Sequence, residues 1–92
     1  MHNIGPEFEF DPAKNAANRL KHGVAFAEVA TCFQDSRALL IEDPAEGEAR
    51  WLVIGLSERG RHLTVCFTLR GEVPRLISAR KATARERASY AR

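Results

Sequence analysis

Four strand-like runs, separated only by short connections, fill the second half of the chain and limit the folds that it can adopt. They span residues 37–42, 50–57, 62–70 and 75–80. Asp43-Pro44, Gly60 and Gly71 supply turn signals after the first, second and third runs. Because consecutive strands joined in this way pair antiparallel, the sequence predicts an antiparallel meander.

Two helices are expected before this region, the first over residues 12–21. Asp11 is a good N-cap and Pro12 suits the first helical position, while Gly23 stands where a left-handed C-cap is usual. A second helix should follow, because apolar side chains then recur with helical spacing at Phe26, Val29, Ala30 and Phe33. Its expected cap is Ala25, and we predict that the Glu28 side chain reaches back to the free N–H of Ala25.

Two shorter elements complete the expected order. The alternation Glu-Phe-Glu-Phe over residues 7–10 predicts a short strand, and Thr83 with Glu86 forms the pattern of a capping box at the start of a last helix. The predicted order is therefore β-α-α-β-β-β-β-α, an α+β fold with the first two helices on one face of the sheet. We expect one domain over residues 7–92 after a short tail, 1–6.

The composition is that of a folded globule. Of 92 residues, 45% are hydrophobic and 28% charged, and no apolar run approaches the roughly 20 residues that span a bilayer. Without a signal-peptide pattern, we expect a cytoplasmic protein that does not engage membranes. Cys32 and Cys66 lie in apolar stretches and are interpreted as buried thiols, although a disulfide between them stays open.

The charge is unevenly distributed. Residues 75–92 contain six basic residues and one acid, for a net charge of +5, whereas residues 1–74 contain eight basic and eleven acidic residues, for −3. This asymmetry indicates an anionic partner for the C-terminal region, most simply the phosphates of RNA. A solvated basic helix would have the same composition and remains an alternative.

Strand alternation predicts which side chains share a face. In the third run, Leu63, Val65, Phe67 and Leu69 should meet the helices, and a polar set should face the other way: His62, Thr64, Cys66, Thr68 and Arg70. In the fourth run, Ser78 and Arg80 should lie opposite Arg75 and Ile77. On the last helix, Glu86 and Tyr90 are one turn apart and should face the same side.

These faces suggest one site for metal-free RNA cleavage. We expect Arg70, Arg80, Glu86 and Tyr90 to meet there, with Lys21 and His22 arriving from the end of the first helix. The reaction needs a base for the 2′-hydroxyl, cations for the charge that develops on phosphate and an acid for the leaving oxygen. Arginine supplies the cations, and glutamate or histidine the base. No metal-ligand or nucleotide-loop motif is present, so no metal or cofactor is expected.

Each of these residues also has a structural explanation. Glu86 is the third helical residue of the capping box, where it can serve as a cap alone. His22 lies at a helix C-terminus, which favours a cation, and Tyr90 can cover the edge of the sheet. Arg85 and Arg87 can be no more than a solvated helix face.

Several segments together resemble the BrnT family of type II toxin–antitoxin toxins. They are FEFDPAKNAANRLKHGVAFAEV, RWLVIG, VCFTLR and RLISARKATARERASY, covering residues 8–90 in order. The resemblance implies a RelE-like ribonuclease fold and RNA cleavage that inhibits translation. It also implies a BrnA-like ribbon-helix-helix antitoxin, which inhibits the toxin and through which the toxin reaches operator DNA.

Motif by motif, the resemblance places functional residues along the whole chain. The implied catalytic residues are Lys21, His22, Arg70, Arg80, Glu86 and Tyr90. Residues expected to bind RNA are Arg50, Ser78, Lys81, Arg85 and Arg87. A non-catalytic nucleic-acid or antitoxin-binding module with the same fold, and a domain that binds an acidic protein surface, are the alternatives.

Overall fold

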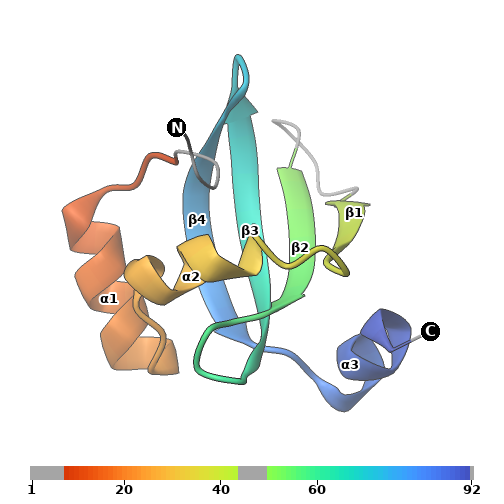
Figure 1. Cartoon of the computed structure of the whole chain (residues 1–92). Helices are drawn as coiled ribbons and strands as arrows, with labels where there is room; N and C mark the ends of the chain where they lie inside the picture. The colour runs from red at the N-terminus through yellow and green to blue at the C-terminus, as the bar shows by residue number, and fades with distance from the viewer. Residues whose placement is uncertain (1–7, 44–49, 92) are drawn as a thin grey trace.

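The computed structural model describes residues 8–43 and 50–91 as three helices and one four-stranded sheet (Figure 1). The helices are α1 (Pro12–His22), α2 (Phe26–Cys32) and α3 (Ala84–Tyr90), and the strands are β1 (Leu39–Asp43), β2 (Arg50–Leu56), β3 (His62–Arg70) and β4 (Val73–Lys81). The sheet is antiparallel in the order β1-β2-β3-β4, which confirms the predicted meander and the α+β class. Helices α1 and α2 lie over one face of the sheet, and α3 lies apart from them at one end.

The helix boundaries follow the capping residues. The Asp11 carboxylate accepts a hydrogen bond from the Ala13 N–H at 2.8 Å, and Gly23 ends α1 with a φ of 71°, a backbone conformation that glycine adopts without strain. At α3, both hydrogen bonds of the Thr83–Glu86 capping box are present. These two local predictions are therefore confirmed.

The segment before α1 is shorter than a strand. Glu9 alone forms a parallel bridge to Arg75, in which its N–H bonds to the Pro74 carbonyl and its own carbonyl accepts from the Leu76 N–H. Residue 7 and the predicted tail, 1–6, lie outside the described residues, and over residues 8–10 the expected strand is reduced to this one bridge.

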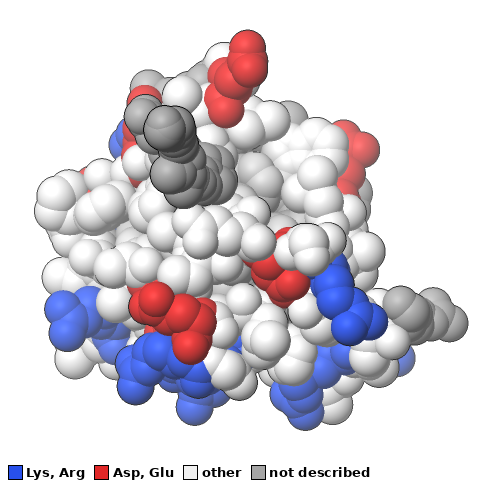
Figure 2. Space-filling model, in the orientation of Figure 1, with Lys and Arg blue, Asp and Glu red and all other residues white. Residues whose placement is uncertain are grey.

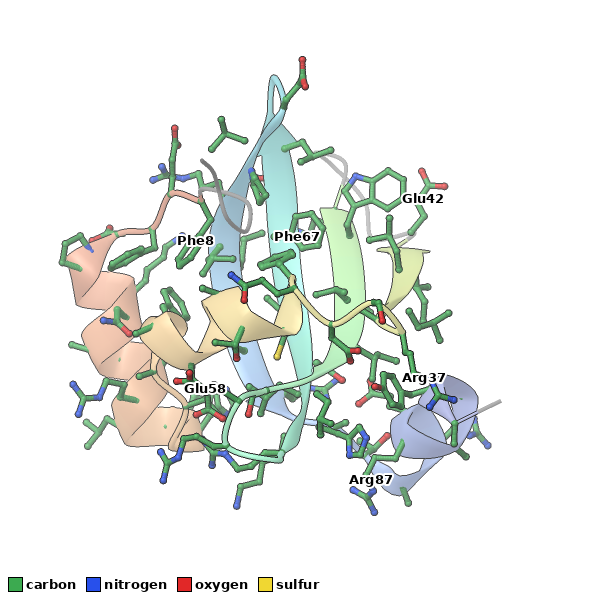
Figure 3. All side chains as sticks on the ribbon, viewed as in Figure 1. Phe8, Arg37, Glu42, Glu58, Phe67 and Arg87 are labelled. Atoms are coloured by element: carbon green, nitrogen blue, oxygen red, sulfur yellow. The ribbon has the colours of Figure 1, made fainter. Side chains whose placement is uncertain are left out.

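The core lies between the sheet and the first two helices. Leu63, Val65 and Phe67 are buried against α2, as the alternation of β3 predicts, whereas Leu69 at the end of the strand is 48% exposed. The side chains of Phe8 and Phe67 both lie on the side that the helices cover (Figure 3). The opposite side of the sheet, called here the outer face, is therefore left for the polar residues of β3 and β4.

A β-bulge changes the faces of β4. Phe67 pairs with Leu76 but its neighbour Cys66 pairs with Ser78, so one extra residue of β4 is accommodated between them. Arg75 pairs with Thr68 and consequently shares the outer face with Ser78 and with Arg80, the cross-strand partner of Thr64. The expectation that Arg75 faces away from Ser78 and Arg80 was wrong, because simple alternation does not include the bulge.

Glu28 has a different role from the one expected. Its side chain is 5% exposed, accepts a hydrogen bond from the Ser57 hydroxyl at 2.6 Å and forms an ion pair with Arg61. The Arg61 guanidinium holds the pKa of Glu28 below its ordinary value despite the burial. Ala25 consequently caps α2 without any side-chain hydrogen bond, and Glu28 instead fastens α2 to the β2–β3 turn.

A buried asparagine, Asn18, holds α1 against β4, which is an edge strand of the sheet. The Asn18 amide nitrogen donates to the carbonyls of Val24 and Ala79 at 2.8 and 2.9 Å, and its oxygen accepts from the Ala79 N–H at 3.0 Å. The side chain therefore satisfies backbone groups that burial would otherwise leave unpaired. This contact sets the position of the end of α1, including Lys21 and His22, relative to β4.

The two cysteines are both thiols, so the alternative of a disulfide is excluded. Cys32 is fully buried, and burial raises the pKa of its thiol to about 12, whereas Cys66 is only half-buried. Among the described residues, no helix has both the length and the apolar character needed to cross a membrane.

Candidate functional site

Arg80 and Glu86 form a two-pronged ion pair between the end of β4 and the first turn of α3. The guanidinium nitrogens donate to the two carboxylate oxygens at 2.7 and 2.9 Å. One of these oxygens also accepts from the Thr64 hydroxyl at 2.9 Å and from the Thr83 N–H at 2.8 Å. Glu86 is therefore both the cap of α3 and the residue that orients Arg80 on the outer face.

The same contacts determine the ionisation of Glu86. Its hydrogen bonds with Arg80, and to a smaller extent those with Thr83 and Thr64, lower its pKa to about 2, although burial acts in the opposite direction. Near neutral pH the carboxylate is ionised and its oxygens are occupied. This arrangement favours an electrostatic and orienting role for Glu86 over that of a proton acceptor.

Tyr90 lies one turn further along α3 and contacts the same region of the sheet. Its ring meets the His62 ring edge-on at a centroid distance of 4.8 Å, and its hydroxyl donates to the Asp35 carboxylate at 2.6 Å. That hydrogen bond raises the pKa of Tyr90. Because Glu86 contacts β3 as well, the prediction that both residues lie on one side of α3 is confirmed.

His62 was not among the expected site residues, although it was placed on the polar face. It lies two positions from Thr64 on β3 and therefore on the same face as the partner of Glu86. The contact with Tyr90 makes His62 part of the site. The sequence pattern that could have identified His62 is its two-residue spacing from Thr64 on the same strand.

A second cluster lies between α1 and β4. Lys14, Lys21, His22 and Ser78 help to line a pocket of about 240 Å³. Ser78 and Arg80 belong to the same strand and face outward from the core, so this pocket and the Arg80–Glu86 pair lie next to each other along β4. Five of the predicted site residues therefore lie on β4 or on the two helices next to it, α1 and α3: Lys21, His22, Ser78, Arg80 and Glu86.

Two predicted arginines lie toward the other end of the sheet. Arg70 pairs with Val73 beside the β3–β4 turn, about 20 Å along β3 from Thr64, the partner of Arg80, at ~3.3 Å per residue. The structure therefore does not bring Arg70 to the Arg80–Glu86 pair. Arg50 opens β2, and its Nε is buried without a hydrogen-bond partner among the described residues. An unpartnered guanidinium nitrogen of this kind is suited to an anionic ligand.

The remaining basic residues surround α3. Lys81 and Arg85 are exposed, and Arg87 donates to the Ala82 carbonyl at 2.9 Å. Basic side chains gather along the lower edge of the molecule in the view of Figure 2, on the side of α3 and of the β2–β3 turn. On the face that Figure 2 shows, this edge is therefore suited to a polyanion.

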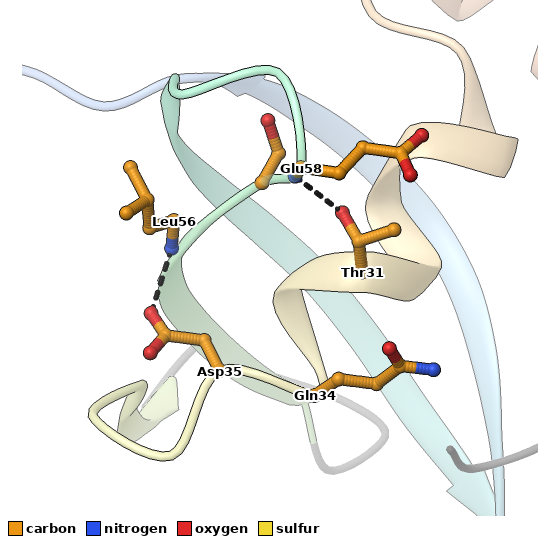
Figure 4. A pocket seen from close by; sticks show the side chains of 6 residues that line it. Thr31, Gln34, Asp35, Leu56 and Glu58 are labelled. Atoms are coloured by element: carbon orange, nitrogen blue, oxygen red, sulfur yellow. Dashed lines mark hydrogen bonds between the residues drawn. The ribbon is translucent and has the colours of Figure 1, made fainter. Parts of the chain in front are cut away.

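A pocket of about 310 Å³ beneath α2 has a structural explanation (Figure 4). The Thr31 hydroxyl accepts from the Glu58 N–H at 2.9 Å, and the Asp35 carboxylate accepts from the Leu56 N–H at 2.9 Å. These hydrogen bonds hold the β2–β3 turn against α2, which explains the polar lining of the pocket, and Asp35 also connects the pocket to Tyr90.

Comparisons with known proteins agree with this fold. The family model described as the ribonuclease toxin BrnT of type II toxin–antitoxin systems matches residues 10–86. The crystal structure of the Brucella abortus ribonuclease toxin BrnT superposes with a TM-score of 0.65 at 26% sequence identity, covering 85% of this chain and 97% of that one. No curated protein matches the chain.

Proposed function

The chain belongs to the family of BrnT ribonuclease toxins of type II toxin–antitoxin systems, and we propose that it cleaves RNA on the outer face, around Arg80, and thereby inhibits translation. The observation that carries this proposal is the Arg80–Glu86 pair. Thr64 and Thr83 hold the carboxylate, the carboxylate holds the guanidinium, and the Arg80 side chain remains 41% exposed. An arginine oriented in advance and accessible to solvent is suited to binding a phosphate.

In the proposed reaction, a base removes the proton from a ribose 2′-hydroxyl, and the resulting oxygen attacks the adjacent phosphorus. The bond to the 5′-oxygen breaks, that oxygen receives a proton, and the products are a 2′,3′-cyclic phosphate and a 5′-hydroxyl. Arg80 stabilises the charge on the phosphate oxygens, and Lys21 adds a second cation from α1. His22 and His62 are the candidate proton-transfer groups, and Glu86 positions Arg80.

The other predicted residues extend this site along the RNA. Arg50, through its unpartnered Nε, and Arg70, from the end of β3, would bind the RNA backbone beyond the cleaved phosphate. Lys81, Arg85 and Arg87 supply positive charge around α3, and Tyr90 supports the site through His62. Because this contribution is electrostatic, RNA binding should weaken as salt concentration rises.

The first experiment tests whether the reaction needs a metal. We expect the purified protein to cleave RNA in EDTA, since the proposed mechanism assigns charge stabilisation to arginine and lysine and proton transfer to side chains. Cleavage would be followed by gel electrophoresis of an end-labelled RNA, with parallel reactions in magnesium. Activity that appears only after magnesium is added would contradict the metal-independent mechanism.

The partner that we propose is a ribbon-helix-helix antitoxin of the BrnA type. It would inhibit cleavage by covering or distorting the outer face, and it would provide the contacts to operator DNA, so that the toxin alone binds the operator poorly. The cationic side chains of Arg80, Lys81 and Arg85 support this proposal, because they are accessible to solvent and attract an acidic inhibitor over long range.

A further inference from the structure

An apolar groove lies on the helix side of the sheet, beyond the part that α2 covers. Its volume is about 450 Å³, and its lining residues come from the α2–β1 connection and all four strands: Phe33, Ala38, Leu40, Trp51, Val53, Phe67, Leu69 and Pro74. Leu40 is 57% exposed and Leu69 48% exposed, so the groove opens to solvent. Exposed apolar surface gathered in one concave place is characteristic of a protein-binding site.

Acidic residues border this groove. Glu42 pairs with Trp51 across β1 and β2 and so shares its face, and Glu72 lies in the β3–β4 turn beside the Leu69–Pro74 pair. Glu9 is not part of this border, because it pairs with Arg75 across the bridge to β4 and its carboxylate lies 3.5 Å from the Arg75 guanidinium on the outer face. In Figure 2 the upper part of this face carries acidic side chains, whereas most of the basic ones lie along its lower edge.

We propose that this groove binds an apolar segment of the antitoxin that is flanked by lysine or arginine residues. The apolar lining would take up the hydrophobic side chains, and the acidic border would attract the basic flanks and disfavour acidic ones. This inference rests on the proposed function, since it assumes an antitoxin. It adds that the antitoxin is anchored on the side of the sheet opposite the RNA site, so that anchoring does not compete with RNA.

The test uses two exposed leucines of the groove and a matched exposed leucine elsewhere. In complexes with the co-encoded antitoxin, Leu40→Ser combined with Leu69→Ser should weaken antitoxin binding by at least about tenfold, because both side chains lose their apolar contacts. Leu20→Ser is the control, because Leu20 is 92% exposed on α1. Binding would be measured by titration, and RNA cleavage by each free variant would be measured in parallel.

The charge of the border is tested separately. Glu42→Lys with Glu72→Lys should also weaken the complex, and the loss should diminish as salt concentration rises, whereas Glu58→Lys, at the β2–β3 turn, should have little effect. In the absence of antitoxin, the groove variant and the border variant should both cleave RNA at the wild-type rate. The antitoxin should inhibit both variants less than it inhibits the wild type.

Different results would overturn different parts of the account. Wild-type affinity in both groove and border variants would place the antitoxin elsewhere. A free toxin that is dimeric by light scattering, and monomeric with Leu40→Ser and Leu69→Ser, would assign the groove to a second copy of this chain. If the wild type formed no complex, the groove assignment and the proposed partner would both fail, while the cleavage assay would still report on the ribonuclease activity.

Discussion

Replacing Arg80 by alanine is expected to reduce the rate of RNA cleavage by about 100- to 1,000-fold, because the substitution removes the guanidinium that stabilises charge on the reacting phosphate. The fold should survive. Arg80 is 41% exposed, and ion pairs at such positions contribute on the order of 1 kcal/mol or less to the free energy of unfolding. The measurement is single-turnover cleavage of a labelled RNA together with the melting temperature.

Arg59→Ala is the matched control for this substitution. Arg59 is 68% exposed and makes only a distant ion pair with Glu28, at 3.9 Å, so its loss should leave the cleavage rate within about twofold of the wild type. Full activity of Arg80→Ala would place the site elsewhere, and a large fall in its melting temperature would show that Arg80 is chiefly structural.

Glu86→Gln is expected to lower the cleavage rate by about ten- to 100-fold through the loss of Arg80 orientation. Glutamine can still accept the hydrogen bond from the Thr83 N–H, so the cap of α3 should persist. Because a pKa of about 2 keeps Glu86 ionised over the near-neutral pH range of the cleavage assay, the shape of the pH–rate profile should not change. Disappearance of one limb of that profile in the variant would instead identify Glu86 as the titrating base.

The difference in stability between the wild type and Glu86→Gln should depend on pH. The pKa of Glu86 falls from 4.5 to about 2 on folding, so the carboxylate stabilises the folded state above pH 4.5 and loses this contribution as the pH falls toward 2. The advantage of the wild type over Glu86→Gln in free energy of unfolding should therefore shrink in acid. Glu58→Gln, which changes an exposed glutamate of the β2–β3 turn, is the control and should show no such trend.

The elements that could be predicted from the sequence are those determined by neighbouring residues. Asp11, Gly23 and the Thr83–Glu86 pair define helix boundaries by local hydrogen bonds and backbone preferences. Helix α1 therefore begins and ends, and α3 begins, where expected. The meander follows from short turns, two of which contain glycines with positive φ, Gly60 at 77° and Gly71 at 62°.

The features that could not be predicted depend on contacts between distant parts of the chain. Glu28 contacts Arg61 only when the fold brings the β2–β3 turn next to α2. The position of Glu28 three residues after Ala25 suggested a capping role instead. The bulge opposite Cys66 and Phe67 leaves no mark in the apolar pattern that separates it from regular alternation.

The candidate site shows the same division. Glu86 and Tyr90 were placed on one side of a helix by their spacing, and Ser78 and Arg80 on one side of a strand, because both relations are local. Arg70 was grouped with them because it is an arginine and because alternation places it on the same face of β3 as Thr64. Alternation does not show how far apart two residues lie along the strand. His62 was overlooked because its partner, Tyr90, comes from another element.

The most direct test of the central claim is to compare the cleavage of an RNA with that of the same sequence carrying 2′-O-methyl groups, in EDTA and with the wild-type protein. The proposed mechanism predicts cleavage of the RNA to products ending in 2′,3′-cyclic phosphate or, after its hydrolysis, 3′-phosphate. It predicts no cleavage of the methylated strand, because a 2′-O-methyl oxygen has no proton to lose and cannot attack the phosphorus. Cleavage of both strands at similar rates, or products bearing a 5′-phosphate, would contradict the mechanism.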